Sequence, residues 1–439
     1  QMINPTNIAQ GTNLMAFDDG TQQTQNAFGK IHINVRQDKL AQYQATEFYK
    51  KFASTSPSFT DGTEEYIAVS DKAVNLLSTT RTDYTFVLPT EVEHNGTKYA
   101  VSLIGDYAFQ NAPNNIKEVV VKSNVKYIGA KAFVPTAGHI ESVFFIESAP
   151  TKSMLSTTRF ELDETGDNYN EFADNTRIYV KKSALTAYQT AWKKMVYDTA
   201  TGTEKVSDFN FTSRIDYKIK DVKIDTKYGT FAREFDTDFS DYYATNNNTK
   251  IAAFVAGSKI ENGPADYGTA TMHIRMTSID LNGGAADSYA YVPAKTGVLL
   301  KVLDSNAAAT PADFYYTIGE KDNTPYNVTK NIMNGVTINP TNVAATASSP
   351  IYVMQKGTFQ KVTTNISNFS VHKAYLKLNN PSGAKVMFHF DDDTTTGIED
   401  ITIDGENKGN DTFYNLNGQR VSNPQRGIYI HNGKKVIIK

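Results

Sequence analysis

Hydrophobic and polar positions repeat in register between residues 101 and 145. The stretch VSLIGDYAFQNAPNNIKEVVV, from Val101 to Val121, is followed at once by VKYIGAKAFVPTAGHIESVFF, from Val125 to Phe145. The positions that match across this offset of 24 residues are apolar or glycine, and most mismatches are polar. Such a pattern predicts units that each add one strand and one turn to a stacked core. The predicted core residues are Ile104, Gly105, Ala108, Phe109, Ile116, Val119, Val121, Ile128, Gly129, Ala132, Phe133, Ile140, Val143 and Phe145.

The segments IGDYAF and IGAKAF are the most specific part of this repeat. They resemble the BspA-type leucine-rich repeats of Bacteroidetes surface proteins, and the lead-in from Tyr84 to Phe109 is similar to the entry into such an array. The resemblance implies a short solenoid and a role in adhesion to host matrix proteins or to other cells. Positions that differ between the units, such as Asp106 and Tyr107 against Ala130 and Lys131, are expected on the outer face.

A second repeat spans a longer distance. INVRQDKLAQYQATEFYKKF begins at Ile33 and IYVKKSALTAYQTAWKKM at Ile178, and each predicts a short strand followed by an amphipathic helix. The predicted N-caps are Asp38 and Ser183. The predicted apolar faces are Leu40, Tyr43, Phe48 and Phe52 in the first copy, and Leu185, Tyr188, Trp192 and Met195 in the second. Residues 53–200 are therefore the repeat domain with its C-terminal cap, and residues 1–52 are either a related cap or an independent lid.

Beyond about residue 200, a polar segment and short β-forming runs replace the periodic pattern. The segment TATGTEKVSDFN at 199–210 is polar and predicts a linker. Short β-forming runs separated by Gly, Pro and Asn then predict an antiparallel sandwich or jelly-roll-like domain over residues 201–395. The segments YVPAKTGVLLK and SVHKAYLKL resemble a β domain in the C-terminal part of many secreted Bacteroidetes proteins.

The last predicted domain, residues 396–439, carries two hairpin signals. Asn417-Gly418 and Asn432-Gly433 suit tight type I′ turns, and apolar residues alternate along the flanking segments. The pattern YNLNGQRV…GIYIHNGKKVIIK resembles the C-terminal sorting tails of the type IX secretion route. The alternative is a plain β-hairpin subdomain. The whole chain is thus expected to be mainly β, α+β overall, with helical caps on the repeat solenoid.

Composition narrows the function classes. The 439-residue chain has no cysteine, which excludes disulfides and thiolate chemistry, and its net charge of −3 gives no electrostatic drive toward nucleic acid. The sequence contains no run of about 18 apolar residues, so no membrane span is expected. The chain begins at Gln1, so a removed signal peptide is presumed, and a secreted or outer-surface location is expected.

Candidate chemistry is sparse. None of the seven histidines lies at metal-ligand spacing from another, and no nucleotide-binding or nucleophile motif occurs. Asp236, Asp238 and Asp241 could offer oxygens to Ca²⁺, but a solvated loop is the favoured interpretation because the EF-hand pattern is incomplete. No catalytic, cofactor-binding or metal residue is assigned, and no cofactor is expected.

The sequence therefore predicts a non-enzymatic binding protein. The expected partner is a host matrix or cell-surface protein recognised by the repeats. The alternative is a carbohydrate-binding protein that uses tyrosines of the 201–395 domain, and an enzyme of unknown type is the third hypothesis. The candidate binding residues are Asp106, Tyr107, Tyr242, Tyr243 and Tyr267, and the sequence carries no signal for oligomeric state.

Overall fold

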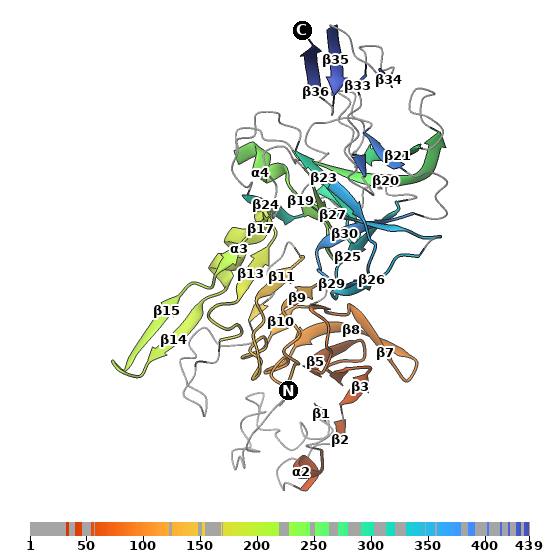
Figure 1. Cartoon of the computed structure of the whole chain (residues 1–439). Coiled ribbons are helices and arrows are strands. Elements are labelled where there is room, and N and C mark those ends of the chain that lie inside the picture. Colours follow the sequence, from red (N-terminus) through yellow and green to blue (C-terminus); the bar gives the residue numbers. More distant parts are fainter. Residues whose placement is uncertain are drawn as a thin grey trace.

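The computed structural model describes most of the residues between 58 and 378, and short elements before and after this range (Figure 1). The described residues are 32–34, 40–45, 54–56, 58–122, 125–147, 152–153, 168, 170–218, 228–245, 251–262, 271–279, 291–302, 313–320, 331–346, 348–355, 358–378, 385–390, 402–403, 413–414, 420–421, 427–431 and 434–438. Strands far outnumber helices among them, which confirms the prediction of a mainly β chain.

Two sheets form the stacked part of the molecule. The first sheet has the order β12-β10-β8-β5-β4-β3, and β7 pairs with β8. The second sheet is parallel throughout and has the order β16-β13-β11-β9-β6. Strands of the first sheet are β3 (Phe59–Asp61), β4 (Glu64–Ala68), β5 (Ala73–Thr79), β7 (Glu91–His94), β8 (Thr97–Ile104), β10 (Tyr127–Ile128) and β12 (Lys152–Ser153). Strands of the parallel sheet are β6 (Thr85–Val87), β9 (Glu118–Val121), β11 (Ser142–Phe145), β13 (Arg177–Val180) and β16 (Phe211–Thr212).

Strand register reproduces the repeat seen in the sequence. Ile128 pairs with Ile104 and Val143 with Val119, which is the same offset of 24 residues. The structure buries all fourteen predicted core residues. It also extends the stack on both sides, because β6 lies next to β9, and β13 next to β11.

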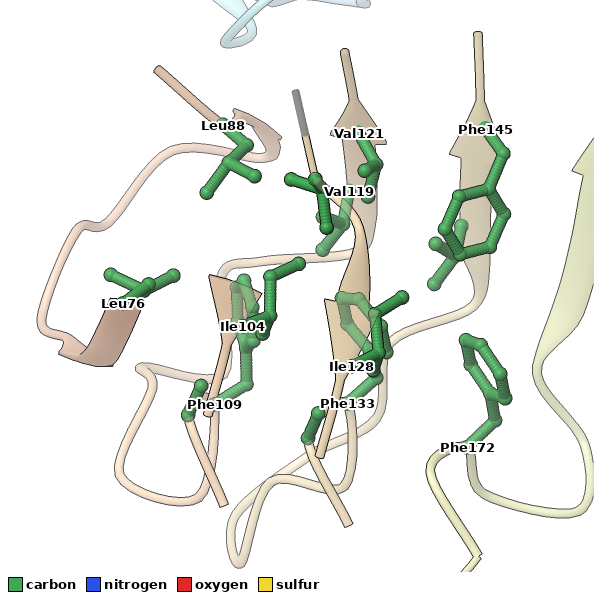
Figure 2. Packing of buried hydrophobic residues seen from close by; sticks show 14 of the residues in the cluster. Leu76, Leu88, Ile104, Phe109, Val119, Val121, Ile128, Phe133, Phe145 and Phe172 are labelled. Carbon is green, nitrogen blue, oxygen red and sulfur yellow. The ribbon is translucent and has the colours of Figure 1, made fainter. Parts of the chain in front are cut away.

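A row of phenylalanines runs through the centre of the stack (Figure 2). Phe109 and Phe133 stack with ring centroids 5.3 Å apart, and Phe133 stacks on Phe172 at 5.1 Å. Phe86 closes one end with an edge-to-face contact to Phe109 at 5.1 Å. Phe172 therefore belongs to a further unit, whose irregular length hides it from the 24-residue alignment.

Both predicted strand-helix segments contain a strand and a helix, and both continue to a parallel strand. In the first copy, β1 (His32–Asn34) and α2 (Leu40–Ala45) lead to β2 (Ser54–Ser56), which pairs with β1. In the second copy, β13 and α3 (Leu185–Ala191) lead to β16.

The second helix differs from its prediction in both ends. Ser183 lies inside a short 3-10 helix, Lys182–Ala184, and does not cap α3, whose N-cap is Ala184. The helix ends at Ala191 because Trp192 is already extended, so Met195 lies in a strand. Tyr188 and Trp192 are buried in the repeat core as expected. Asp38, Phe48 and Phe52 lie outside the described residues.

The predicted linker at 199–210 contains a strand. β15 (Thr203–Ser207) pairs antiparallel with β14 (Lys194–Asp198) to form a separate two-stranded hairpin. Polarity misled the prediction, since a strand exposed on both faces needs no apolar side.

A second β region follows the stack, in three sheets and a two-stranded ladder. The six-stranded sheet has the order β18-β23-β20-β21-β31-β32, and its β21–β31 pair is parallel, so the predicted purely antiparallel arrangement is wrong at this pair. Its strands are β18 (Tyr228–Phe231), β20 (Ile251–Asn262), β21 (Thr271–Ser278), β23 (Val298–Val302), β31 (Lys385–Phe390) and β32 (Thr402–Ile403). A four-stranded sheet holds β17 (Ile215–Lys218), β24 (Asp313–Ile318), β19 (Thr237–Asp238) and β22 (Tyr291–Val292). Another holds β25 (Met333–Val336), β30 (Lys373–Lys377), β27 (Ile351–Gln355) and β28 (Thr358–Lys361), and the two-stranded ladder holds β26 (Thr341–Val343) and β29 (Ile366–Phe369).

The C-terminal segment forms a small sheet of its own. The order β34-β33-β35-β36 contains the antiparallel hairpin of β35 and β36. Its strands are β33 (Phe413–Tyr414), β34 (Arg420–Val421), β35 (Gly427–His431) and β36 (Lys434–Ile438). The two Asn-Gly pairs lie outside the described residues. No helix of the described part has the length and hydrophobicity needed to cross a membrane.

Candidate functional site: the contact between the parallel sheet and the second β region

The parallel sheet is buried on both of its faces. In β9, β11 and β13 the residues on either side of each strand centre point into the repeat core, whereas the central residues Val120, Phe144 and Tyr179 point the other way. These three side chains belong to a second apolar cluster that includes residues of the second β region. The face that an open repeat sheet would present to solvent is therefore covered by the chain itself.

Aromatic packing closes this contact. The Phe144 ring stacks on Tyr179 at 4.9 Å and meets Phe235 at 5.0 Å. In the same apolar cluster, Phe231 packs edge-to-face on Tyr316 at 5.0 Å. All five aromatic residues are buried, and burying one such ring contributes roughly 1.5–3 kcal/mol. The contact is thus a hydrophobic core in its own right.

Three ionisable side chains lie at the border of this aromatic contact. Glu118, on β9, accepts a hydrogen bond from Arg233 Nη1, with a closest N–O distance of 3.2 Å, and its Oε2 lies 3.1 Å from Nε2 of His372. The Arg233 guanidinium also stacks over the rings of Phe144, at 4.7 Å, and Phe235, at 5.0 Å. Because Glu118 belongs to the repeats and its two partners to the second region, the cluster joins the two parts.

Each ionisable group of this cluster shifts the pKa of its neighbours. Burial alone would raise the pKa of Glu118, but Arg233 and His372 together outweigh it and lower this pKa to about 2. Burial and the neighbouring Arg233 charge lower the pKa of His372, against the opposing effect of Glu118. At neutral pH the cluster is therefore a carboxylate, a guanidinium and a neutral imidazole. A carboxylate held so firmly ionised is a poor general base, and the arrangement suits a structural joint.

The edge of the parallel sheet is covered as well. The Thr85 amide in β6 donates to the carbonyl of Ile338 at 2.9 Å, and the Tyr84 amide donates to Oδ1 of Asn339 at 2.8 Å. The Asn339 amide in turn donates to Asp83 at 2.6 Å. A loop of the second region thus occupies the open side of the last parallel strand, which protects it from edge pairing.

The Glu118 cluster is one polar anchor between the two parts of the chain. A second polar anchor involves residues that directly follow β13. Asp241, in α4 (Ser240–Thr245), pairs with Lys182 and accepts a hydrogen bond from the Tyr315 hydroxyl at 2.9 Å. Arg214 stacks on the Tyr315 ring at 4.7 Å. The Ser183 amide donates to Glu320 at 2.8 Å. Two polar anchors and an apolar centre therefore hold the second region on the repeats.

Of the five residues predicted to bind a partner, the structure describes the side chains of Asp106, Tyr107 and Tyr242. Oδ1 of Asp106 accepts the Ala130 amide at 2.8 Å, so this carboxylate links one repeat turn to the next. Tyr107 is half-buried in a left-handed backbone conformation, with φ of 58°. Tyr242 packs against Phe314 at 4.8 Å, and the side chain of Tyr243 and all of Tyr267 lie outside the described residues.

Other expectations for the outer face are corrected by burial. Ala130 is 1% and Lys131 8% exposed, because the next repeat unit covers these turn positions. The Lys131 amide donates to the carbonyl of Asn170 in that unit.

The three aspartates considered for Ca²⁺ point to separate partners. Asp236 accepts from Tyr291 and from the Ala294 amide, Asp238 accepts from the Ser240 amide, and Asp241 belongs to the second anchor. Within the described ranges, no three carboxylate or imidazole groups assemble into a metal site.

Sequence reasoning missed the contact itself, although a signal was present. The last three residues of the strands EVVV, SVFF and RIYV form continuous apolar runs in the parallel sheet. A strand with one solvent face alternates polar and apolar residues, whereas a continuous run is typical of a strand buried on both faces. The partner residues, Arg233 and His372 among them, carry no such signal because they lie in loops far along the chain.

Comparison with known proteins gives limited likeness. No protein-family model and no curated protein matches the chain. Among solved structures, it is similar to a leucine rich cell surface protein from Faecalibacterium prausnitzii, with 18% identity over 29% of this chain and 30% of that chain, at a TM-score of 0.19. It is also similar to a leucine-rich repeat protein from Bacteroides capillosus, with 20% identity over 28% of this chain and 98% of that chain, at a TM-score of 0.17. The chain thus spans under a third of the length of the first protein.

Proposed function

We propose that the chain is a secreted or cell-surface, non-enzymatic protein that binds another protein through the turns of a short leucine-rich-repeat solenoid of the BspA type. Support comes from the IGDYAF and IGAKAF segments and from the strand register, which follows the same 24-residue repeat. In this proposal residues 53–200 are the solenoid with its helical cap, residues 1–52 a related cap, residues 201–395 a sandwich-like module and residues 396–439 a sorting tail.

We choose the turns as the binding surface because the second β region covers the outer face of the parallel sheet. Val120, Phe144 and Tyr179 lie under the second β region, so the parallel face has no room for a partner. The turns between the strands remain accessible, and Asn111, Asn115 and Thr136 are exposed at their tips. Polar, exposed loop positions on a rigid scaffold are where binding residues concentrate in proteins. The partner class is a host matrix or cell-surface protein, as the family resemblance implies.

Binding of the full-length protein to immobilised fibronectin and fibrinogen tests this proposal. The variant Asn111→Arg/Asn115→Arg places two bulky charges on the turn tips, and the matched control Thr363→Arg/Asn365→Arg places them at exposed positions of the second region. We expect the turn variant to lose at least about tenfold in affinity, the effect of one moderate interface residue, and the control to bind unchanged. Equal losses in both variants, or no binding of the unaltered protein to either matrix protein, would contradict the proposal.

A further inference from the structure

The two strand-helix-strand units differ by one insertion. In the first unit, His32 pairs with Ser54, 22 positions further along the chain. In the second, Ile178 pairs with Phe211, 33 positions further along. The additional residues fall between α3 and β16, where the β14–β15 hairpin lies. The hairpin is therefore an elaboration of a unit whose other copy closes without it.

The hairpin is firmly attached at its base. Trp192 and Phe209, just outside its two strands, are both buried in the repeat core. The Asn170 side chain accepts from the Met195 amide at 2.9 Å and donates to the Met195 carbonyl at 2.7 Å. Asn168 accepts from the Tyr197 amide at 2.8 Å. These asparagines occupy the outer side of β14, so one edge of the hairpin is already satisfied.

The edge of β15 is open. All five residues of β15 are exposed, and it pairs with no strand other than β14 among the described residues. The described part of the chain has two exposed large hydrophobic residues, Tyr127 and Val206. Val206 is the more exposed of the two, at 56%. Figure 1 shows the hairpin projecting from the body of the molecule beside α3. An exposed edge offers a row of unpaired amides and carbonyls to an incoming strand.

We propose that the β15 edge binds an extended peptide segment of a partner protein as an additional antiparallel strand. The charges of β15 define the segment. Glu204 and Lys205 are adjacent and point to opposite faces of the hairpin, and Val206 follows them. An antiparallel partner strand complements them when it carries, in its own N-to-C order, an apolar, an acidic and a basic residue.

The same charges argue against a second copy of this chain as the occupant. Two β15 strands related by a two-fold axis would place Lys205 opposite Lys205, Glu204 opposite Glu204, or Glu204 opposite Asp208 in the registers of greatest overlap. Like charges face one another in each of these arrangements, which is destabilising across a strand pair. The observations therefore favour a different protein with the complementary charge order.

Peptide binding to the full-length protein tests the inference. The probe is the capped peptide Ser-Thr-Ile-Asp-Lys-Thr-Ser, and its control is Ser-Thr-Ile-Lys-Asp-Thr-Ser. Hydrogen exchange of the β15 amides and fluorescence anisotropy of the labelled peptides are the two readouts. We expect slower exchange in β15 and about tenfold tighter binding of the probe than of the control, since two cross-strand charge pairs change sign.

The charge-swapped protein Glu204→Lys/Lys205→Glu keeps the hairpin composition and should reverse the peptide preference. No protection of β15, equal affinity for the two peptides, or a preference that the swap does not reverse would overturn the inference. Protection that appears with protein concentration alone would identify a second copy as the occupant and overturn it too. Because the swap lies away from the repeat turns, matrix-protein binding should be unaffected, so failure of the two proposals can be distinguished.

Discussion

The two faces of one parallel sheet are built on different principles. On the inner face, Val119, Val143 and Ile178 belong to the same apolar cluster as the phenylalanine row, and paired strands bring together apolar residues of successive repeats. On the outer face, an aromatic centre is bordered by Glu118 and Arg233, which join segments 115 residues apart. The inner face holds the repeat units together, and the outer face binds the second β region to them. Breaking each face separately should therefore produce different losses.

The largest expected loss comes from the phenylalanine row. Phe133 is fully buried between Phe109 and Phe172, so Phe133→Ala removes two ring contacts and leaves a cavity in the stack. We expect the free energy of unfolding to fall by about 3–5 kcal/mol, as measured by urea denaturation of the full-length protein. Tyr127→Ala is the matched control, because Tyr127 is 40% exposed on a neighbouring strand. A loss no greater than that of the control would show that the row does not carry the stack.

A smaller and more local loss is expected on the outer face. Arg233→Met keeps the length and apolar stem of the side chain but leaves Glu118 with His372 as its remaining ionisable partner. We expect a loss of about 3 kcal/mol, the lower end for breaking a buried ion pair, because that second partner stays. Faster limited proteolysis between the two parts should accompany it.

The double variant Glu118→Gln/Arg233→Met separates charge from packing. Removing both charges avoids the unpaired buried carboxylate, so most of the lost stability should return. If the double variant is as unstable as Arg233→Met, the loss reflects stacking of the guanidinium on Phe144 and Phe235 and not the ion pair.

The same contrast explains how much could be predicted from the sequence. Repeat contacts join residues 24 positions apart, so Ile104, Phe109 and their counterparts are visible as a period. Phe172 escaped because its unit has a different length, and the strand nature of 203–207 escaped because β15 buries no side chain. The outer contact depends on how two regions dock, and nothing in a periodic pattern specifies which loop brings Arg233 or His372 to Glu118.

Acid should weaken the outer face before the inner one, and this is the mildest way to distinguish them. His372 faces Glu118, Arg233 and the edge of the Tyr84 ring, and its pKa is lowered in the folded protein. The unfolded chain therefore takes up this proton first, and stability should decline as the pH falls below about 6.5, the ordinary value for histidine. Glu118, with a pKa of about 2, adds a second decline between pH 4.5 and 2.

Among the described residues, the only ionisable members of the inner hydrophobic cluster are tyrosines, which stay neutral throughout this range. Urea denaturation of the unaltered protein and of His372→Gln between pH 7.5 and 4 separates the two declines. The variant should show a shallower slope between pH 7 and 5. It should keep a smaller decline below pH 4.5, because Arg233 still lowers the pKa of Glu118 after the contribution of His372 is lost. Parallel curves for the two proteins over the whole range would show that protonation of His372 does not govern how the second region is held on the repeats.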